Sequence, residues 1–156
     1  MNLILDLDNT IVCSKSFKGT EKNKMKQLSK DYLYVDYPEH KREIRIFLRP
    51  GLDKFLDNIF KNFKVSVWSL GEKNYVNFIC KNIIENKHRK IRLILNRSHS
   101  DLADKLLNGE SPKDLRLVYS VFPDIYTPEN TVIVDDKTYN SKGQKDNFIK
   151  VEPFVV

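Results

Sequence analysis

Short apolar runs along the chain indicate buried strands, and polar or helical segments follow them. The first run covers residues 3–5 and ends at Asp6, so we expect a buried strand that begins almost at residue 1. Similar runs recur further along the chain. They predict strands at residues 64–68, 91–95 and 131–134, with a short last strand at residues 148–151.

Between these strands, apolar residues recur with the spacing of amphipathic helices. Over residues 52–63 they fall at i, i+3, i+4 and i+7, which predicts a helix with one buried face after the chain break at residues 49–51. A second helix is predicted over residues 75–84 and a helical turn over residues 101–107. A loop punctuated by prolines then continues to Pro128.

Two segments near the N-terminus complete the expected arrangement. Residues 32–35 and 44–48 are rich in aromatic and β-branched residues, and we interpret them as a hairpin that lies near the first strand. Residues 15–30 contain six lysines among Ser, Asn and Gly. That composition indicates a solvated loop or a weak helix.

Strands that alternate with helices favour an α/β domain with a mostly parallel sheet. The chain shows neither an internal repeat nor an interdomain linker, so residues 1–156 are expected to form one domain. Such sheets bind their ligands beyond the carboxyl ends of the strands. Polar residues follow three of the predicted strands at that end: Asp6 and Asp8, Ser69, and Asp135 with Asp136.

The composition, 40% hydrophobic and 31% charged, excludes a disordered chain and a membrane-spanning one. The N-terminus lacks the features of a signal peptide, and two cysteines are too few for a disulfide framework. We therefore expect an intracellular protein, cytoplasmic or nuclear, without a membrane partner. The net charge of +6 suits an anionic partner such as a phosphoprotein, a nucleotide or a nucleic acid.

The polar residues at the strand ends suit the hydrolysis of a phosphate monoester. That reaction needs a nucleophile, an acid for the leaving oxygen and positive charge over the phosphoryl oxygens. Mg²⁺ supplies such charge and prefers carboxylate oxygens, which Asp6, Asp8, Asp135 and Asp136 offer. Ser69 can donate a hydrogen bond to a phosphoryl oxygen. Asp6 and Asp8 share a face if the strand continues, whereas a turn after Asp6 lets Asp8 reach the far side of the substrate.

These motifs resemble those of the haloacid-dehalogenase superfamily, which implies a Rossmann-like sheet. Residues 5–12 resemble motif one in its Asp-x-Asp-x-Thr form. Residues 48–56, with Arg-Pro-Gly, resemble the segment before motif two in the phosphatases of the RNA polymerase II C-terminal domain and their small NIF-like relatives. The resemblance extends from residue 3 to about residue 151. Motifs two, three and four correspond to residues 67–69, 113–115 and 132–136.

The resemblance implies a role for each motif residue. Asp6 would form an aspartyl-phosphate, and Asp8 would act as general acid and then as the base that activates water. Ser69 and Lys113 would hold the phosphoryl group, with Thr10 among the residues that bind the substrate.

The resemblance also implies a Mg²⁺ site. Asp6, the backbone carbonyl of Asp8 and the acidic pair Asp135 and Asp136 would hold the ion, with Asp136 favoured as the direct ligand of that pair.

The chain departs from the family pattern beside the expected substrate groove. Asp136-Lys137-Thr138 stands where the family usually has Asn-Ser-Pro, and Leu70-Gly71-Glu72 follows motif two in place of small residues around Ala-Ser. The motifs leave no room for a large cap domain, so an open site favours a phosphorylated macromolecule. The leading hypothesis is a protein serine/threonine phosphatase, and a viral origin is compatible with it. The alternatives are a polynucleotide or nucleotide phosphatase and a catalytically silent phosphate-binding module.

Overall fold

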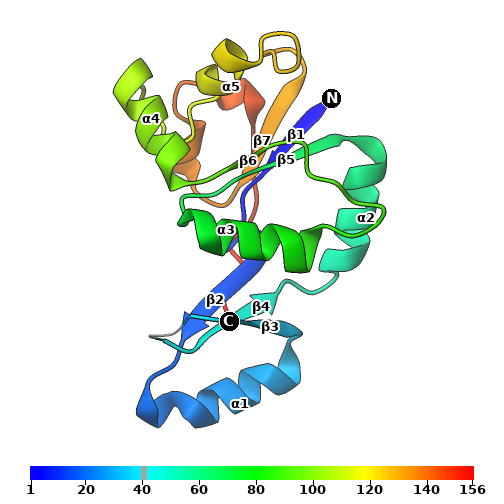
Figure 1. The fold of residues 1–156 in the computed structure, drawn as a ribbon, viewed down its shortest axis with the longest axis vertical. Coiled ribbons are helices and arrows are strands. Elements are labelled where there is room, and N and C mark those ends of the chain that lie inside the picture. Colours follow the sequence, from blue (N-terminus) through cyan, green and yellow to red (C-terminus); the bar gives the residue numbers. More distant parts are fainter. Residues whose placement is uncertain (40–41) are drawn as a thin grey trace.

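The computed structural model describes residues 1–39 and 42–156 and shows a parallel sheet with helices on both faces (Figure 1). The strand order is β6-β5-β1-β7-β8, and every neighbouring pair runs parallel. This confirms the predicted α/β class. The strands are β1 (Asn2–Leu5), β5 (Lys64–Trp68), β6 (Ile94–Leu95), β7 (Thr131–Asp135) and β8 (Phe148–Lys150).

The two neighbours of the central strand β1 end close to the same edge of the sheet as β1 itself. Leu5 pairs in register with Val67 of β5 on one side and with Val134 of β7 on the other. All four residues of β1 are buried, as a strand covered on both faces requires. The residues that follow β1, β5 and β7 therefore emerge at one edge of the sheet.

Helices cover the two faces of the sheet through separate apolar cores. One face packs Leu3, Leu5 and Val67 against α2 and α3, and the other packs Ile4 and Trp68 against α4 and α5. The helices are α2 (Leu52–Asn62), α3 (Lys73–Ile79) with the π-helical turn η2 (Cys80–Ile84), α4 (Arg97–Leu107) and α5 (Arg116–Val121). Among the described residues, no helix has the length and apolar character needed to cross a membrane.

Local sequence explains where α2 and α4 begin. Gly51 has φ 78°, a left-handed conformation that suits glycine, and it turns the chain into α2. Asn96 caps α4 because its side chain accepts a hydrogen bond from Ser98 N at 3.0 Å while Asn96 N donates to His99 Nδ1 at 3.0 Å.

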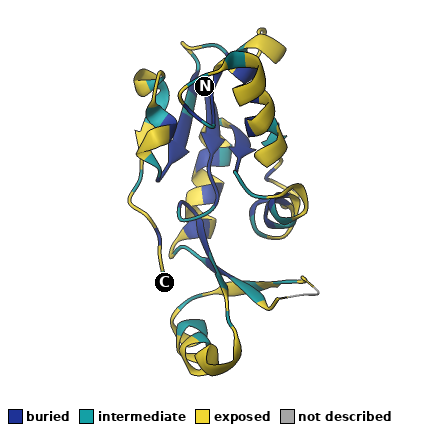
Figure 2. Ribbon diagram, turned by 90° about the vertical axis from the view of Figure 1, so that its left-hand side faces the viewer, coloured by how far each residue is buried: buried dark blue, intermediate teal, exposed yellow. Residues whose placement is uncertain are grey.

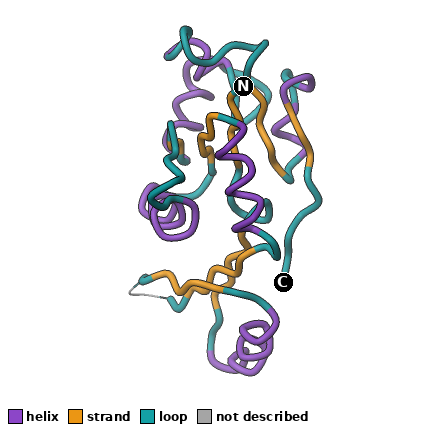
Figure 3. Tube along the Cα trace, turned by 90° about the vertical axis from the view of Figure 1, so that its right-hand side faces the viewer, coloured by secondary structure: helices purple, strands orange, loops and turns teal. Residues whose placement is uncertain are grey.

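An insertion at residues 12–48 forms a second, antiparallel sheet of order β2-β4-β3, which Figure 3 shows below the main sheet. The predicted hairpin is confirmed as β3 and β4, but it pairs with a strand that the apolar pattern did not predict. That strand, β2, reads Val-Cys-Ser-Lys-Ser, with too few apolar residues to stand out. The insertion contains β2 (Val12–Ser16), η1 (Gly19–Glu21), α1 (Lys22–Asp31), β3 (Tyr34–Tyr37) and β4 (Ile44–Leu48).

Three further expectations needed correction. The strand predicted at residues 91–95 is only Ile94–Leu95, although Arg92 N still donates to Val65 O at 2.9 Å. The helical turn predicted at residues 101–107 is the longer helix α4, which starts at its Asn96 cap. The segment predicted as a loop contains α5, whose Leu117 and Val118 pack on the sheet. Tertiary packing stabilises this short helix despite its weak local signal.

The C-terminal residues join the insertion to the loop after β1. Phe154 N donates to the carbonyl of Asn9 at 2.6 Å. The Phe154 ring is buried with Cys13 and Phe47, and it meets Tyr32 edge-on at 5.8 Å between ring centroids. Figure 2 shows this end of the chain leaving the main sheet toward the insertion. Phe154 thus ties three separate parts of the chain together.

Replacing Phe154 with alanine should lower the free energy of unfolding by about 3 kcal/mol, because it empties a buried ring site. Urea denaturation followed by circular dichroism measures this change. The control is Val155→Ala, whose side chain is exposed and should change stability by under about 0.5 kcal/mol. Equal stability of the two variants would contradict the anchoring role of Phe154.

Candidate active site

The chain turns out of the direction of β1 after Asp6, so that Asp8 lies in the following loop. The carbonyl of Leu7 accepts hydrogen bonds from the backbone N–H groups of Thr10, Ile11 and Val12, at 2.9–3.2 Å. Asn9 has φ 61°, a left-handed conformation that asparagine tolerates better than most residues. Asp6 therefore stays at the sheet edge while Asp8 lies within a tight turn. Of the two arrangements open from sequence, the structure shows the turn.

A buried lysine lies between two carboxylates at the end of the sheet. Lys113 Nζ is 2.5 Å from Asp6 Oδ1 and 2.7 Å from Asp135 Oδ2. Its side chain is only 2% exposed, and that of Asp135 is fully buried. Thr10 Oγ1 donates to the other oxygen of Asp6 at 2.7 Å. Both oxygens of Asp6 are thus held, which fixes the direction of its carboxylate.

The segment that carries Lys113 is attached to the loop after β7. Gln144 Nε2 donates to the carbonyls of Lys113 and Asn140 at 2.8 and 2.7 Å. Ser111 Oγ also donates to the Asn140 carbonyl, at 3.2 Å. The side chain of Asn140 donates to Asp135 Oδ2 at 2.9 Å. These contacts place the lysine and the acidic pair as one unit.

Asp6, Asp135 and Asp136 form a buried acidic cluster in which one oxygen from each lies within 4.8 Å of the others. Asp136 Oδ2 is 2.9 Å from Lys137 Nζ, and both carboxylate oxygens of Asp136 are buried and accept no hydrogen bond from the described residues. Three hard oxygen donors, one of them from a carboxylate that accepts no hydrogen bond, are the donor set that a divalent cation such as Mg²⁺ uses. The residues present therefore fit a cation site.

Asp8 is held by residues from two other elements. Tyr75 of α3 donates its phenolic hydrogen to Asp8 Oδ1 at 2.6 Å, and Ser14 of β2 makes a short hydrogen bond with the same hydroxyl. Burial raises the pKa of Tyr75, and the nearby carboxylate of Asp8 raises it further. The phenol therefore stays protonated and acts as the donor.

Ser69 follows β5 and lies at the same sheet edge as Asp6 because β5 pairs with β1. Its side chain is buried, and its Oγ accepts a hydrogen bond from Gly71 N at 3.0 Å. A Cβ atom on Gly71 would lie 3.2 Å from Ser69 Oγ and 2.9 Å from Tyr75 Cδ1. Glycine at position 71 thus allows Ser69 and Tyr75 to approach the same turn.

Burial and charge oppose each other at the buried pair. Burial raises the pKa of Asp6 to about 6, although Lys113 pulls it down. For Lys113, burial lowers the pKa, but Asp6 and Asp135 raise it more, and the result lies above the ordinary value for lysine. Lys113 therefore remains an ammonium. The pKa of Asp8 is also raised, first by burial. A raised pKa suits a carboxyl group that must carry a proton.

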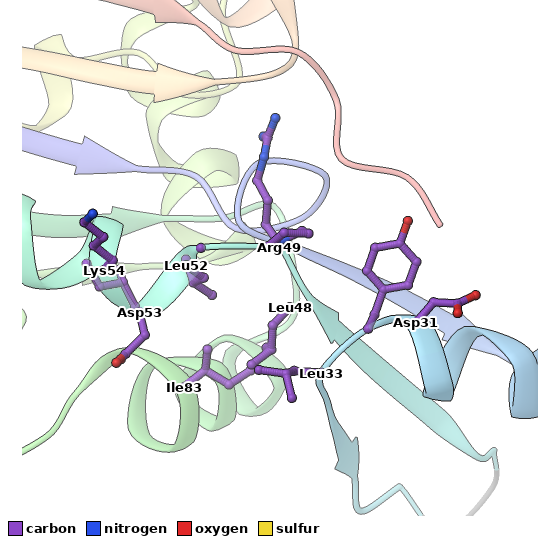
Figure 4. Close-up of a pocket in the computed structure, with 12 residues that line it drawn as sticks. Asp31, Leu33, Leu48, Arg49, Leu52, Asp53, Lys54 and Ile83 are labelled. Atoms are coloured by element: carbon purple, nitrogen blue, oxygen red, sulfur yellow. The ribbon is translucent and has the colours of Figure 1, made fainter.

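Arg49 supports the loop after β1 from the insertion side. Its guanidinium donates to the carbonyls of Thr10 at 2.8 Å and Glu152 at 3.1 Å. Arg49 also lines a cavity of about 420 Å³, and Figure 4 shows its side chain extending away from Leu48 and Ile83, which line another side of that cavity. None of the predicted catalytic or metal-binding residues lines that cavity. Arg49 thus links the loop after β1 to the C-terminal residues.

The structure brings the predicted site residues to one edge of the sheet and adds partners that motif reasoning missed. Tyr75 contacts Asp8, Asn140 contacts Asp135, and Gln144 holds the Lys113 segment. Tyr75 was expected only as an apolar residue of its helix. A polar hydroxyl on that apolar face was a signal that it has a polar partner. Asn140 and Gln144 carry no such signal, because Asn140 lies in the short 3-10 helix Thr138–Ser141 and Gln144 in the turn that follows, where no apolar spacing marks them.

Known proteins resemble this chain in sequence and, where a structure is solved, in fold. A putative CTD phosphatase-like protein 355R of Invertebrate iridescent virus 3 is 36% identical over 97% of this chain and 83% of its own length. The protein of the same description in Invertebrate iridescent virus 6 is 32% identical over 98% of this chain and 85% of its own length. Both relatives are viral proteins.

A solved structure of the fission yeast RNA polymerase II CTD phosphatase Fcp1, bound to beryllium fluoride, shares the fold with a TM-score of 0.72 and 22% identity. The match covers 98% of this chain and 41% of that of Fcp1, so this chain spans about two fifths of that protein. The sequence model of the family described as NLI interacting factor-like phosphatase matches residues 1–156. The chain therefore belongs to the NLI interacting factor-like phosphatase family.

Proposed function

We propose that this protein is a magnesium-dependent phosphatase that removes phosphate from phosphoserine or phosphothreonine in proteins, with residues 1–156 acting as one catalytic domain. The observation that carries the proposal is Lys113, buried between Asp6 and Asp135 beside an acidic cluster. The family to which the chain belongs is described as phosphatase-like. The full set of acids, Asp6, Asp8, Asp135 and Asp136, argues against a silent binding module.

The reaction would run in two steps on Asp6 and Asp8. An oxygen of Asp6 forms a bond to phosphorus while the bond from phosphorus to the serine or threonine oxygen breaks. Asp8 gives its proton to that leaving oxygen. Asp8 then takes a proton from water, whose oxygen attacks the phosphorus of the aspartyl-phosphate. Inorganic phosphate leaves, the carboxylate of Asp6 is free again, and Asp8 carries its proton again.

The phosphoryl group would be held by residues that surround Asp6. Lys113 supplies a fixed positive charge next to the nucleophile, where the Asp6 carboxylate and the dianionic phosphate would otherwise repel each other. Ser69 can offer its hydroxyl to a phosphoryl oxygen from the neighbouring strand. Thr10 was expected to bind substrate, and its hydrogen bond to Asp6 Oδ2 supports instead a role in aiming the nucleophile.

Asp6, Asp136 and the carbonyl of Asp8 would hold Mg²⁺. When bound, the ion neutralises charge on the phosphoryl oxygens and on the attacking carboxylate. Asp135 is a poorer ligand than Asp136 because its oxygens already accept hydrogen bonds: Lys113 Nζ and Asn140 Nδ2 bond to one, and Lys137 N to the other at 2.7 Å. This favours Asp136 as the direct ligand and Asp135 as the partner that positions Lys113.

The relatives support a protein substrate and an intracellular setting. Two viral relatives are described as CTD phosphatase-like, and a macromolecular chain suits a site that the insertion flanks without a large cap. Both cysteines, Cys13 and Cys80, are buried and free, as in proteins of reducing compartments. We place the activity in the cytoplasm or nucleus of a cell, with infection as one such setting.

Saturating Mg²⁺ should raise the melting temperature, because the ion neutralises buried carboxylates in the folded state only. At one hundred times its dissociation constant it adds about 2.7 kcal/mol to the free energy of unfolding, which corresponds to about 5–10 °C. Differential scanning calorimetry measures the shift. Asp136→Asn should lose most of it, whereas Asp101→Asn, on the exposed face of α4, should keep it. A full shift in Asp136→Asn would remove Asp136 from the metal site.

Asp6→Asn should lower the turnover of phosphoserine peptides by at least about 10⁴-fold, since an amide oxygen is too weak a nucleophile to replace a carboxylate. The fold should persist, because Asp135 still pairs with the Lys113 ammonium and the amide oxygen can still accept from Thr10. Phosphate release measures turnover, and circular dichroism checks the fold. Asp53→Asn, an exposed change on α2, serves as the matched control. Turnover above one tenth of the native rate in Asp6→Asn would rule out the mechanism.

A further inference from the structure

The net positive charge of the chain is concentrated in one segment. Residues 15–30 contain six lysines and a single acid, Glu21, so they carry five of the six net positive charges of the protein. The rest of the chain is nearly neutral by comparison. We call residues 15–30 the lysine segment, and its lysines are Lys15, Lys18, Lys22, Lys24, Lys26 and Lys30.

The charge of the lysine segment is not used inside the protein. Lys15 is half-buried and the other five lysines are exposed. In the part of the chain that the structure describes, none of the six forms an ion pair. No residue of α1 is fully buried, and Figure 2 shows this helix largely exposed. The positive charge therefore faces solvent without an internal counter-charge.

Three of the lysines form a row along α1. Lys22, Lys26 and Lys30 recur every fourth residue, which places them one above the other on a helix, over about 12 Å. The half-buried Met25 and Leu28 lie on a different side of the helix, and Leu28 packs against the core of the insertion. The row is thus a regular array of ammonium groups, which can bind an extended chain that carries several negative charges.

The lysine segment is connected directly to the candidate active site. Strand β2 begins at Val12, next to the loop that carries Asp8, and ends at Ser16 where the lysines follow. Five residues of strand span about 17 Å. Figure 1 shows α1 beyond the small sheet, at the end of the long axis of the molecule. An extended peptide rises about 3.3 Å per residue, so about five residues match the length of β2 and about three more reach onto the lysine row.

The aromatic residues around the lysine segment favour a peptide over a nucleic acid. Phe17 and Tyr32 pack into the core of the insertion. The Arg45 guanidinium covers the ring of Tyr34, at 3.8 Å from its centroid. Single-stranded nucleic acids bind where bases stack on free aromatic rings between positive charges. Half-buried rings, and a ring with one face under a guanidinium, offer little surface for such stacking, whereas lysines alone suffice for phosphate and carboxylate groups.

We infer that the lysine segment is a second anion-binding surface, which docks another phosphorylated or acidic part of the protein substrate whose phosphate lies at Asp6. The inference rests on the proposed function, since it assigns a protein substrate to the same site. It also narrows the substrate class. The preferred substrate carries a second negative group about five to eight residues from the phosphate that is removed.

Kinetics with synthetic peptides test this docking surface. One peptide carries a single phosphoserine, and the other carries a second phosphoserine six residues away. The triple variant Lys22→Glu, Lys26→Glu, Lys30→Glu should raise the KM of the doubly phosphorylated peptide at least about tenfold and leave its kcat within about twofold. The control Lys61→Glu, Lys81→Glu, Lys105→Glu makes the same charge change at exposed positions elsewhere. Equal KM values in the two triple variants would overturn the inference.

Three further measurements separate docking from chemistry. An aryl phosphate is too short to reach the lysine row, so its turnover should be alike in both triple variants. Raising the salt concentration to 1 M should remove the KM difference, because the Debye length falls to about 3 Å. Fluorescence anisotropy with the Asp6→Asn protein measures binding of the doubly phosphorylated peptide without turnover. Loss of that binding in the lysine variant supports docking. If the native protein fails to hydrolyse phosphopeptides, that failure refutes the proposed function but not the docking surface.

A single-stranded oligonucleotide of equal charge is the competing probe. Tighter binding of the oligonucleotide than of the peptide, lost in the same lysine variant, would overturn the choice of a protein partner.

Discussion

The rest of the site depends on one interaction, the ion pairing of the buried Lys113 ammonium group with the carboxylates of Asp6 and Asp135. An isolated charge in this position would be strongly destabilising, and removal of one partner from a buried ion pair leaves an uncompensated charge that costs about 3–5 kcal/mol. The two carboxylates come from adjacent strands, and the lysine comes from the segment before α5. Satisfying this charge therefore requires the sheet edge and that segment to be folded together.

The register of the parallel strands makes this arrangement possible. Leu5 and Val134 are paired, so Asp6 and Asp135 leave the sheet side by side, and burial raises the pKa of Asp6 to about 6 despite the lysine. Asp8 belongs to the same motif but lies in the following turn, where Tyr75 from α3 holds it. Two carboxylates two residues apart thus acquire different surroundings, which is the physical basis for assigning them different roles.

Much of the main sheet was predictable because β1 and β7 contain continuous apolar runs, β5 is rich in Val and Trp, and polar residues stand at the end of each strand. The common position of Asp6, Ser69 and Asp136 followed from the rule that parallel strands expose their carboxyl ends at one edge. The third strand of the insertion could not be predicted in this way, since β2 mixes Ser and Lys with Val and Cys. The hydrogen bonds of Asn140 and Gln144 were equally hidden, because no regular spacing marks either residue and Gln144 bonds to Lys113, which is 31 residues away in sequence.

The central claim is that Asp6 itself receives the phosphoryl group. Acid quenching during turnover of a phosphopeptide, followed by borohydride reduction, converts an aspartyl-phosphate to homoserine, and peptide mass spectrometry locates the change. We predict homoserine at position 6 in the native protein with Mg²⁺ and substrate, and unmodified aspartate at positions 8, 135 and 136. Unmodified Asp6 in a reacting sample whose phosphate release has reached a steady state, or reduction at one of the other carboxylates, would contradict the account.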